Sequence, residues 1–494
     1  MQDLIVGRLR AQPDGAPTPI WLRRDSVFWL VVVSALFLVA ELTPSLLRMP
    51  LGADEITYIA RTSARASSIS LPPVHGQGAG LLAAPVTLFT TSLLALRIWM
   101  SVLSAVGLFL TILCWRGLRP IWVLALGELI FASLAISQNS GVQVYPDWWG
   151  ALATVALIGL FLHAVNGTMR NRVGLPLIGL ASLVIVLMRP QNVVFLMGPV
   201  ILAVLIVPKW RKIRIMAAMA AGIALGFLEW TLGAYLWFGG LFERIHLAGQ
   251  EPPPLGLYNA LGLQLRYLNG PWYCSADCTT WAVPLETPFW IGFLALAVLG
   301  VWVGWRSSMR ASTVLAAATA LWVFLLYAFL VPFGAPRYLL PTLALMSVLA
   351  ADGIVWAVTK SRWRQEAAIL AVLFLVLGIV SQRAIVQRQA AYQFISRQFQ
   401  RQAVELEQMG VHPPCVALNP SIAWYIGCSA PWTTNGNYYQ IMHQFLEQNT
   451  KAGPSGWKLF HLTGRIHPPA IPPPLVYLPA SSPLIKAQQH SGAS

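Results

Sequence analysis

Acidic side chains are scarce in this chain. Only 18 of its 494 residues are Asp or Glu, and charged residues make up 10% of the total, against roughly 25% in an ordinary soluble domain. This scarcity argues against a soluble globular protein of this length, whose surface would need far more charge. It also makes each remaining carboxylate a candidate for chemistry.

Several familiar catalytic motifs are missing as well. The sequence has no HExxH zinc motif, no P-loop glycine pattern, no GxSxG nucleophile motif and no internal repeat, so it lacks the usual marks of several enzyme classes. The net charge of +15 would suit a nucleic-acid binder. The Lys and Arg residues, however, cluster at the ends of apolar segments, so nucleic acid is not an expected partner.

Apolar stretches of about 18 or more residues recur along most of the sequence, which is 56% hydrophobic with a mean hydropathy of +0.62. Such stretches are typical of membrane-spanning helices. We therefore expect an all-α polytopic membrane protein with about eleven transmembrane helices. The expected spans are residues 27–46, 93–114, 120–137, 148–165, 173–188, 192–208, 214–236, 288–305, 312–331, 338–357 and 366–381.

The basic clusters predict the orientation of these spans, because they fall at every second crossing and cytoplasmic loops carry more Lys and Arg. The protein is expected in the cell (plasma or inner) membrane, with its N-terminus cytoplasmic and its C-terminus extracytoplasmic. The first span is interpreted as a retained signal anchor. Gly80–Leu96 is apolar but interrupted by Pro85, and is either a re-entrant or tilted piece or a twelfth span.

Three regions then lie outside, at about 47–92, 237–287 and 382–494. We expect a transmembrane domain over 1–381, a small α/β extracytoplasmic domain over 382–480, and a disordered tail over 481–494. In the first loop, Asp54–Ser68 is expected to form an amphipathic helix lying on the membrane.

The five cysteines test this topology. Cys114 lies within a span, whereas the other four form two local pairs, Cys274 with Cys278 and Cys415 with Cys428, both in predicted outer regions. Two disulfides in an oxidising compartment are expected. A four-thiol zinc site or free thiols are the alternatives.

An adjacent carboxylate pair, Asp54-Glu55, follows the first span directly. At a water–lipid boundary, low dielectric and a neighbouring anion raise a carboxyl pKa, which suits a general base. The other interpretation is an exposed pair capping an interfacial helix. Asp147 stands at the outer start of a later span, either as its N-cap or as a second carboxylate facing the same cavity and sharing a metal with the first.

Arginines on the outer side run against the positive-inside bias, and their planar fork binds phosphate well. Snorkelling to the interface is the alternative for each of them. His75 is the histidine near the acidic pair, either at the site or as an interfacial polar residue. The candidate substrate-binding residues are Tyr58, Arg61, Arg65, His75, Arg189, Arg337 and Tyr338.

Taken in order, several segments resemble the glycosyltransferase C superfamily, in the branch that contains protein O-mannosyltransferases and lipid A aminoarabinose transferases. The resemblance covers about residues 27–357 and rests on order and placement rather than on one motif. The segments are Asp54-Glu55-x-x-Tyr58, Pro72-Pro73, Leu81-Leu82-Ala83-Ala84-Pro85, Leu93-Leu94-Ala95-Leu96-Arg97, Tyr145-Pro146-Asp147, Leu187-Met188-Arg189-Pro190 and Arg337-Tyr338-Leu339-Leu340-Pro341.

The resemblance implies transfer of a sugar from a polyprenyl-phosphate carrier to a glycan, lipid or protein acceptor on the outer side. Asp54 would match the base, with Glu55 assisting. Asp147 would match a second outer carboxylate, where some relatives bind a divalent metal and others do not. Arg337 and Tyr338 would hold the carrier phosphate.

The chain departs from the pattern before Pro72-Pro73, where relatives often carry His or Lys and this chain has Leu71. Arg65 or His75 would have to replace that basic contact. A transporter or flippase of a lipid-linked substrate is the main alternative, although internal repeats, which that class tends to show, are missing. A non-catalytic scaffold is a third. The sugar and the acceptor stay open.

Overall fold

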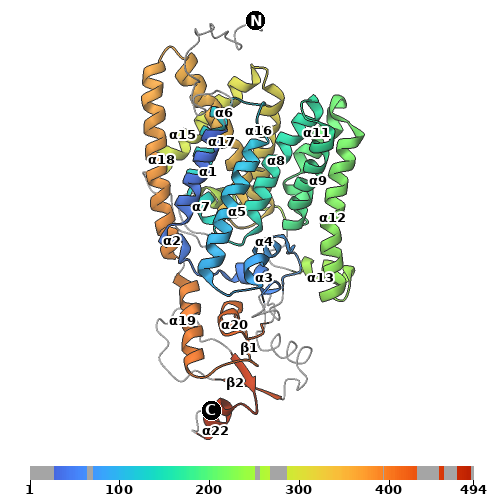
Figure 1. Ribbon diagram of the computed structural model, residues 1–494, viewed down its shortest axis with the longest axis vertical. Coiled ribbons are helices and arrows are strands. Elements are labelled where there is room, and N and C mark those ends of the chain that lie inside the picture. Colours follow the sequence, from blue (N-terminus) through green and yellow to red (C-terminus); the bar gives the residue numbers. More distant parts are fainter. Residues whose placement is uncertain are drawn as a thin grey trace, which may run out of the picture.

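Long apolar helices form most of the molecule, and a small α/β domain lies at one end of them (Figure 1). The computed structural model describes residues 27–63, 71–250, 256–267, 286–392, 394–430, 456–460 and 476–490. In this part of the chain, eight helices are long and apolar enough to cross a membrane. They are α5 (Leu93–Leu113), α8 (Pro146–Asn166), α9 (Asn171–Met188), α12 (Ile213–Trp237), α15 (Glu286–Trp305), α16 (Arg310–Leu330), α17 (Leu340–Lys360) and α18 (Arg364–Tyr392).

A ninth span is a bent pair, and two of the expected eleven spans are shorter than predicted. Helices α6 (Ile121–Ser133) and α7 (Ala135–Gly141) meet at 79°. Residues 27–46 form α1 (Phe28–Glu41) and α2 (Pro44–Leu47), and residues 192–208 form α10 (Asn192–Phe195) and α11 (Gly198–Ile206). A straight span needs about 20 residues, so the described residues give eight or nine spans by length rather than eleven.

The bundle has a buried centre and an apolar outer surface. In α8 and α17, 83% of the most apolar 18-residue window is buried, against 22% in α12 and α18. The outer faces of α12 and α18 expose large apolar side chains such as Leu228, Leu232 and Leu370. Such a surface fits lipid rather than water, and the chain is a multi-pass membrane protein.

Short helices gather at the end of the bundle that carries the small domain (Figure 1). They include α3 (Ala53–Ala60), α4 (Gly78–Thr87) and α13 (Leu241–Gly249), and α14 (Leu261–Tyr267) follows later in the chain. Helix α3 is shorter than the predicted Asp54–Ser68, part of which lies outside the described residues. At ten residues, α4 is too short to be the twelfth span, and it contains Pro85.

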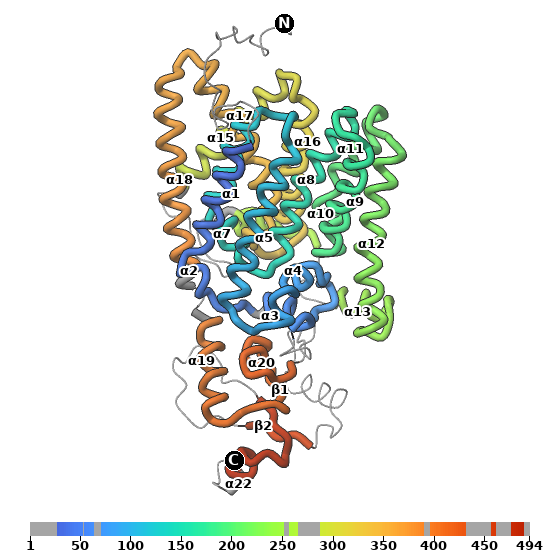
Figure 2. The backbone as a smooth tube through the Cα atoms, in the orientation of Figure 1, coloured from blue at the N-terminus to red at the C-terminus, as the bar shows by residue number. Residues whose placement is uncertain are grey.

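The small domain follows α18, which runs along the bundle and leads into α19 (Phe394–Gln408) (Figure 2). Its sheet has the order β1-β3-β2 and is antiparallel throughout. The domain contacts the bundle through α20 (Pro420–Ile426), where the Tyr425 hydroxyl accepts a hydrogen bond from the Leu51 amide at 3.3 Å. The strands are β1 (Val416–Ala417), β2 (Trp457–Phe460) and β3 (Val476–Pro479), and the last helix is α22 (Pro483–His490).

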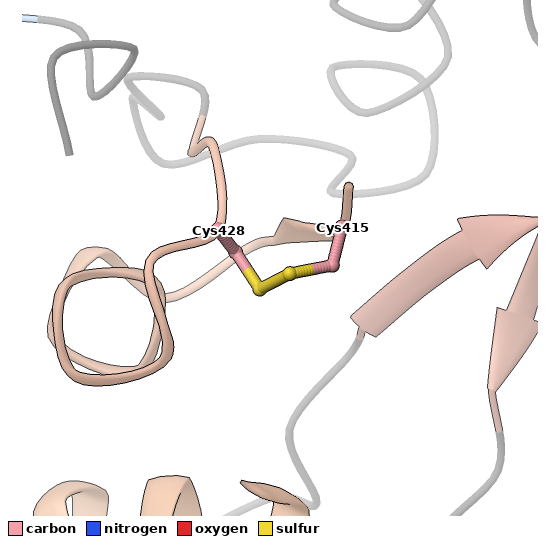
Figure 3. The surroundings of a disulfide bond; sticks show 2 residues. All are labelled: Cys415 and Cys428. Atoms are coloured by element: carbon pink, nitrogen blue, oxygen red, sulfur yellow. A yellow bond between two sulfur atoms is a disulfide. The ribbon is translucent and has the colours of Figure 1, made fainter. Parts of the chain in front are cut away.

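Two predictions about the C-terminal region meet different outcomes. Because Pro483–His490 form α22, the disorder expected for residues 481–494 is wrong for this stretch. The cysteine prediction is confirmed for Cys415 and Cys428, which form a disulfide beside α20 (Figure 3). Cys274 and Cys278 lie outside the described residues, and Cys114, the C-cap of α5, is a free thiol.

Candidate active site

Glu55 is fully buried and anchors the start of α3. Its Oε2 accepts a hydrogen bond from the Gly52 amide at 3.0 Å, which is the glutamate half of a capping box. Both of its carboxylate oxygens also accept hydrogen bonds from Arg97 of α5, at 2.5 and 3.0 Å. The Val144 amide donates to the same carboxylate at 2.9 Å. With both oxygens occupied inside the protein, Glu55 is arranged to position α3 rather than to assist chemistry as the sequence suggested.

Arg97 extends this anchor to the backbone around the site. It donates hydrogen bonds to the carbonyl oxygens of Met49 and Pro50 before α3, and to that of Val142 before α8. In the sequence, Arg97 is part of the matched segment Leu93-Leu94-Ala95-Leu96-Arg97, but no role was predicted for it. The available signal was its charge within a predicted span, since such residues are rare and usually serve a structural or functional purpose.

Asp54, one residue earlier, faces the other way and belongs to a charged cluster. Its Oδ2 lies 3.2 Å from Nη2 of Arg337, and its side chain is 52% exposed. Arg337 Nε lies 3.2 Å from Asp147 Oδ2. Asp147 Oδ1 in turn lies 3.4 Å from Nη1 of Arg189. The structure therefore places Asp54, Asp147, Arg189 and Arg337 in one array of alternating charge.

Four different parts of the chain supply this array. Asp54 lies in the first turn of α3, and Asp147 in the first turn of α8. Arg189 is the C-cap of α9, and Arg337 lies in the 3-10 helix η3 (Pro336–Leu339) before α17. An acidic residue at a helix N-terminus is favoured by the helix dipole. The ends of these helices thus converge on one place.

Aromatic rings flank both arginines. The Arg337 guanidinium carbon lies 4.6 Å from the ring centre of Tyr145 and 5.4 Å from that of Tyr338. The Arg189 guanidinium carbon lies 5.1 Å from Tyr338. Tyr338 itself stacks on Tyr327 at 4.8 Å. These cation–π contacts hold the guanidinium planes in place, and they bring Tyr338 next to both arginines.

Tyr58 and His75 stack on each other, with ring centres 4.7 Å apart. Within the described structure, His75 Nδ1 and Arg189 Nε are buried without a hydrogen-bond partner, and the Tyr58 hydroxyl is buried close to the Arg189 side chain. Burial lowers the pKa of His75 well below 6.5, and the positive charges of Arg189, Arg337 and Arg244 lower it further. Burial also raises the pKa of the Tyr58 hydroxyl. Both side chains are therefore neutral at ordinary pH and present polar atoms that a bound group could satisfy.

Arg244 of α13 clamps the loop that carries His75, and sequence reasoning missed it. It is fully buried and donates to the carbonyl oxygens of Pro73, His75 and Trp230 at 2.9, 2.8 and 2.6 Å. Its position in a predicted outer loop gave no sign of this role. The contact depends on tertiary packing between the first and second outer loops.

Glycines let this loop approach its neighbours closely. A β-carbon on Gly76 would lie 2.3 Å from the Leu187 carbonyl oxygen, and one on Gly80 would lie 2.3 Å from that of Tyr58. Both distances are far below van der Waals contact, so only glycine fits. The loop thereby sits against α3 and the end of α9.

The remaining predicted contacts are not part of the array. Arg61 stacks on Trp237 of α12, with its guanidinium carbon 3.8 Å from the ring centre. Arg65 lies outside the described residues.

A divalent metal does not fit the described carboxylates. Asp54 and Asp147 are both within 3.2 Å of Arg337, whose guanidinium takes the place between them that a shared cation would need. Among the described residues, no three His, Cys, Asp or Glu side chains gather as metal ligands do. Asp147 thus serves as an arginine partner, and the metal expected for it finds no support in this geometry.

Comparisons by sequence find no relative: neither a protein-family model nor a curated protein matches the chain. Comparison by structure, in contrast, finds similar solved proteins. ArnT from Cupriavidus metallidurans bound to undecaprenyl phosphate superposes with a TM-score of 0.63 at 11% identity, covering 92% of this chain and 98% of that one. The chain has the glycosyltransferase C fold.

Two further structures of this fold agree. The apo form of the same ArnT gives a TM-score of 0.60 over 91% of this chain and 97% of that one, at 11% identity. The Archaeoglobus fulgidus oligosaccharyltransferase in its apo form gives 0.53 over 89% of this chain and 67% of that one, at 12% identity. The resemblance drawn from ordered motifs over residues 27–357 is thus confirmed for the fold, and the structural match to ArnT extends beyond those residues to 92% of the chain.

Proposed function

We propose that this protein is an integral membrane glycosyltransferase that moves a sugar from a polyprenyl-phosphate carrier to an acceptor on the extracytoplasmic side. One observation carries the proposal: a half-exposed carboxylate, Asp54, lies beside the guanidinium of Arg337, which Asp147 links to the buried Arg189. A base and an anion site next to each other are what this transfer requires. The fold shared with ArnT, whose structure holds undecaprenyl phosphate, supports the same reading.

The carrier phosphate would bind at Arg337 and Arg189. Guanidinium groups pair with phosphate through two parallel hydrogen bonds, and the flanking rings of Tyr145 and Tyr338 already hold these planes. The unpartnered Arg189 Nε and the Tyr58 hydroxyl, which is buried close to Arg189, offer two further donors. This set replaces the basic residue that is missing before Pro72-Pro73.

Asp54 would act as the general base. The acceptor hydroxyl passes its proton to the Asp54 carboxylate while its oxygen forms a bond to the anomeric carbon of the sugar. The bond from that carbon to the carrier phosphate oxygen breaks, and its electron pair stays on the phosphate. Arg337 and Arg189 stabilise the negative charge that builds there.

Phosphate binding would also prepare the base. In the described state Arg337 holds both Asp54 and Asp147. A phosphate that engages Arg337 competes with Asp54 for it and frees the Asp54 carboxylate to accept a proton. Asp147 would hold Arg337 and Arg189 in position for the phosphate. Donor binding would therefore come before the release of the Asp54 carboxylate.

The membrane orientation is part of the proposal. Basic clusters lie between helices at the end opposite α3, as at Lys209–Arg214 and Lys360–Arg364, and Lys and Arg favour the cytoplasmic side. The Cys415–Cys428 disulfide lies at the end that carries α3, and disulfides belong to oxidising compartments. Both features support an extracytoplasmic position for Asp54.

The test is Asp54→Asn in purified protein supplied with a panel of polyprenyl-phosphate hexoses and pentoses, with release of polyprenyl phosphate as the readout. We expect a loss of about a hundredfold or more, since a general base contributes on that order. Glu366→Gln, which neutralises an exposed carboxylate at the far end of α18, should keep full activity. Asp54→Asn enzyme that works at the wild-type rate would remove the base from the proposal.

A second experiment distinguishes the proposed glycosyltransferase from the transporter alternative. Wild-type protein in liposomes that moves the intact carrier across the bilayer, without cleaving its sugar–phosphate bond, would favour a flippase.

A further inference from the structure

A cationic groove lies at the junction between the helix bundle and the small domain. Helix α2 and Arg48 form one wall of the groove, and α19 forms the other. The volume of the groove is about 740 Å³. This volume is within the range of roughly 300–1,000 Å³ that small-molecule sites occupy. Its lining residues are Pro44, Ser45, Arg48, Arg397, Gln400, Arg401, Val404 and Glu405.

Positive charge dominates the groove. Three arginines, Arg48, Arg397 and Arg401, face one acidic residue, Glu405. All four side chains are exposed. In a chain with so few acidic residues, three guanidinium groups around one hollow form a site for an anion, and guanidinium pairs preferentially with phosphate or carboxylate.

The two walls of the groove come after two apolar helices in the chain. Its first wall, α2, follows α1 after two residues, and its second wall, α19, follows the span α18 after one. The first wall follows the apolar helix α1 closely, whereas the second follows the polar C-terminal part of α18, residues 381–392. Val404, which is exposed, and Pro44 add apolar side chains to a lining that is otherwise polar or charged. An amphiphile with an anionic head matches this mixture better than a free ion does.

We propose that this groove binds the phosphate headgroup of an anionic membrane lipid, at a place separate from the Asp54 array. Arg48, Arg397 and Arg401 would contact the phosphate, and Gln400 and Ser45 would contact the polar part next to it. Such a lipid would fix α19, and with it the small domain, against α2. The inference does not rest on the glycosyltransferase chemistry or on the membrane orientation.

The experiment measures binding of dioctanoyl-phosphatidylglycerol to the full chain in uncharged detergent. We expect Arg397→Gln/Arg401→Gln to weaken binding by at least about tenfold, because each basic residue near an anionic lipid contributes on the order of 1 kcal/mol. The control, Lys458→Gln/Lys486→Gln, removes the same charge from exposed sites in the same domain and should bind within about twofold of wild type.

Three further arms locate and classify the ligand. Dioctanoyl-phosphatidylcholine should bind at least about tenfold more weakly, since its head has no net charge. Inorganic phosphate should displace the lipid only at much higher concentration. Arg337→Gln should still bind the lipid, whereas the Arg397→Gln/Arg401→Gln variant should not. This difference would distinguish the groove from the donor site.

Each contrary outcome overturns the inference. Equal binding by Arg397→Gln/Arg401→Gln and wild type removes the groove as the site. Equal affinity for phosphatidylcholine removes selectivity for an anionic head, and displacement by phosphate at matching concentration makes this a free-phosphate site. The groove arginines are exposed, so the melting temperature of each variant should match that of wild type, which shows that the fold survives.

Discussion

The guanidinium of Arg337 lies 3.2 Å from the Asp54 carboxylate, so the proposed base is already engaged by a cation. In this arrangement Arg337 occupies one oxygen of the carboxylate that the acceptor hydroxyl would have to reach. A donor phosphate at Arg337 resolves this by taking over the hydrogen bond. The same residue would then both bind the leaving group and control the base.

Arg337→Lys tests this double role. Lysine keeps the positive charge but loses the fork that reaches Asp54 and Asp147 together. We expect kcat/KM to fall about tenfold or more, with Arg337→Gln falling further. Arg364→Lys, at an exposed site on α18, is the matched control and should be unaffected. Wild-type kinetics in Arg337→Lys would show that a simple point charge suffices.

Metal removal should leave the reaction intact. Arg337 supplies the positive charge between Asp54 and Asp147, so a divalent cation has no pair of free carboxylates to bridge. We expect the same rate of polyprenyl phosphate release with an excess of EDTA as with added Mg²⁺, Mn²⁺ or Zn²⁺. A rate that collapses with EDTA and returns with one of these ions would require a different arrangement of Asp147.

Glu55→Gln should damage the fold before it damages chemistry. Glu55 and Arg97 are both fully buried, and removing one partner of a buried ion pair costs about 3–5 kcal/mol because the other charge is left without compensation. We expect a clear loss of melting temperature in detergent. Asp54→Asn, at a half-exposed pair, should change stability by at most about 1 kcal/mol. An inactive Glu55→Gln protein with the wild-type melting temperature would instead make Glu55 a catalytic residue.

The sequence predicted the membrane class and singled out the four residues that the structure brings together, for identifiable reasons. Asp54, Asp147, Arg189 and Arg337 each stand where a hydrophobic segment ends, so hydropathy locates them, and helix ends on one side of a membrane share one level. The roles within the pair Asp54-Glu55 were not predictable. Adjacent residues on a helix point about 100° apart, and only the packing of α3 on α5 decides which one meets Arg97.

The acid dependence of stability should report His75. The folded pKa of this histidine lies well below the unfolded value of 6.5, through burial first and nearby arginines second. Below about pH 6.5 the unfolded chain therefore binds a proton that the folded chain does not, so stability falls as pH falls. We expect the drop in melting temperature from pH 7.5 to 5.5 to shrink in His75→Asn. The exposed His412→Asn should show the wild-type drop, and equal drops in all three proteins would contradict the burial of a neutral His75.

Gly80→Ala tests the close approach of α4 to α3. A β-carbon at residue 80 would lie 2.3 Å from the Tyr58 carbonyl oxygen, and this oxygen belongs to the backbone of the helix that carries Asp54. Since a backbone atom cannot turn aside as a flexible side chain does, α3 must shift or α4 must separate from it, at a cost of about 1–3 kcal/mol. We expect a lower melting temperature together with a lower kcat, because the same shift moves Asp54 relative to Arg337. Gly262→Ala adds the same methyl group where no atom lies within 4 Å, and it should change neither quantity. If Gly80→Ala lost stability but kept its kcat, the position of α3 would matter less to Asp54 than this packing implies.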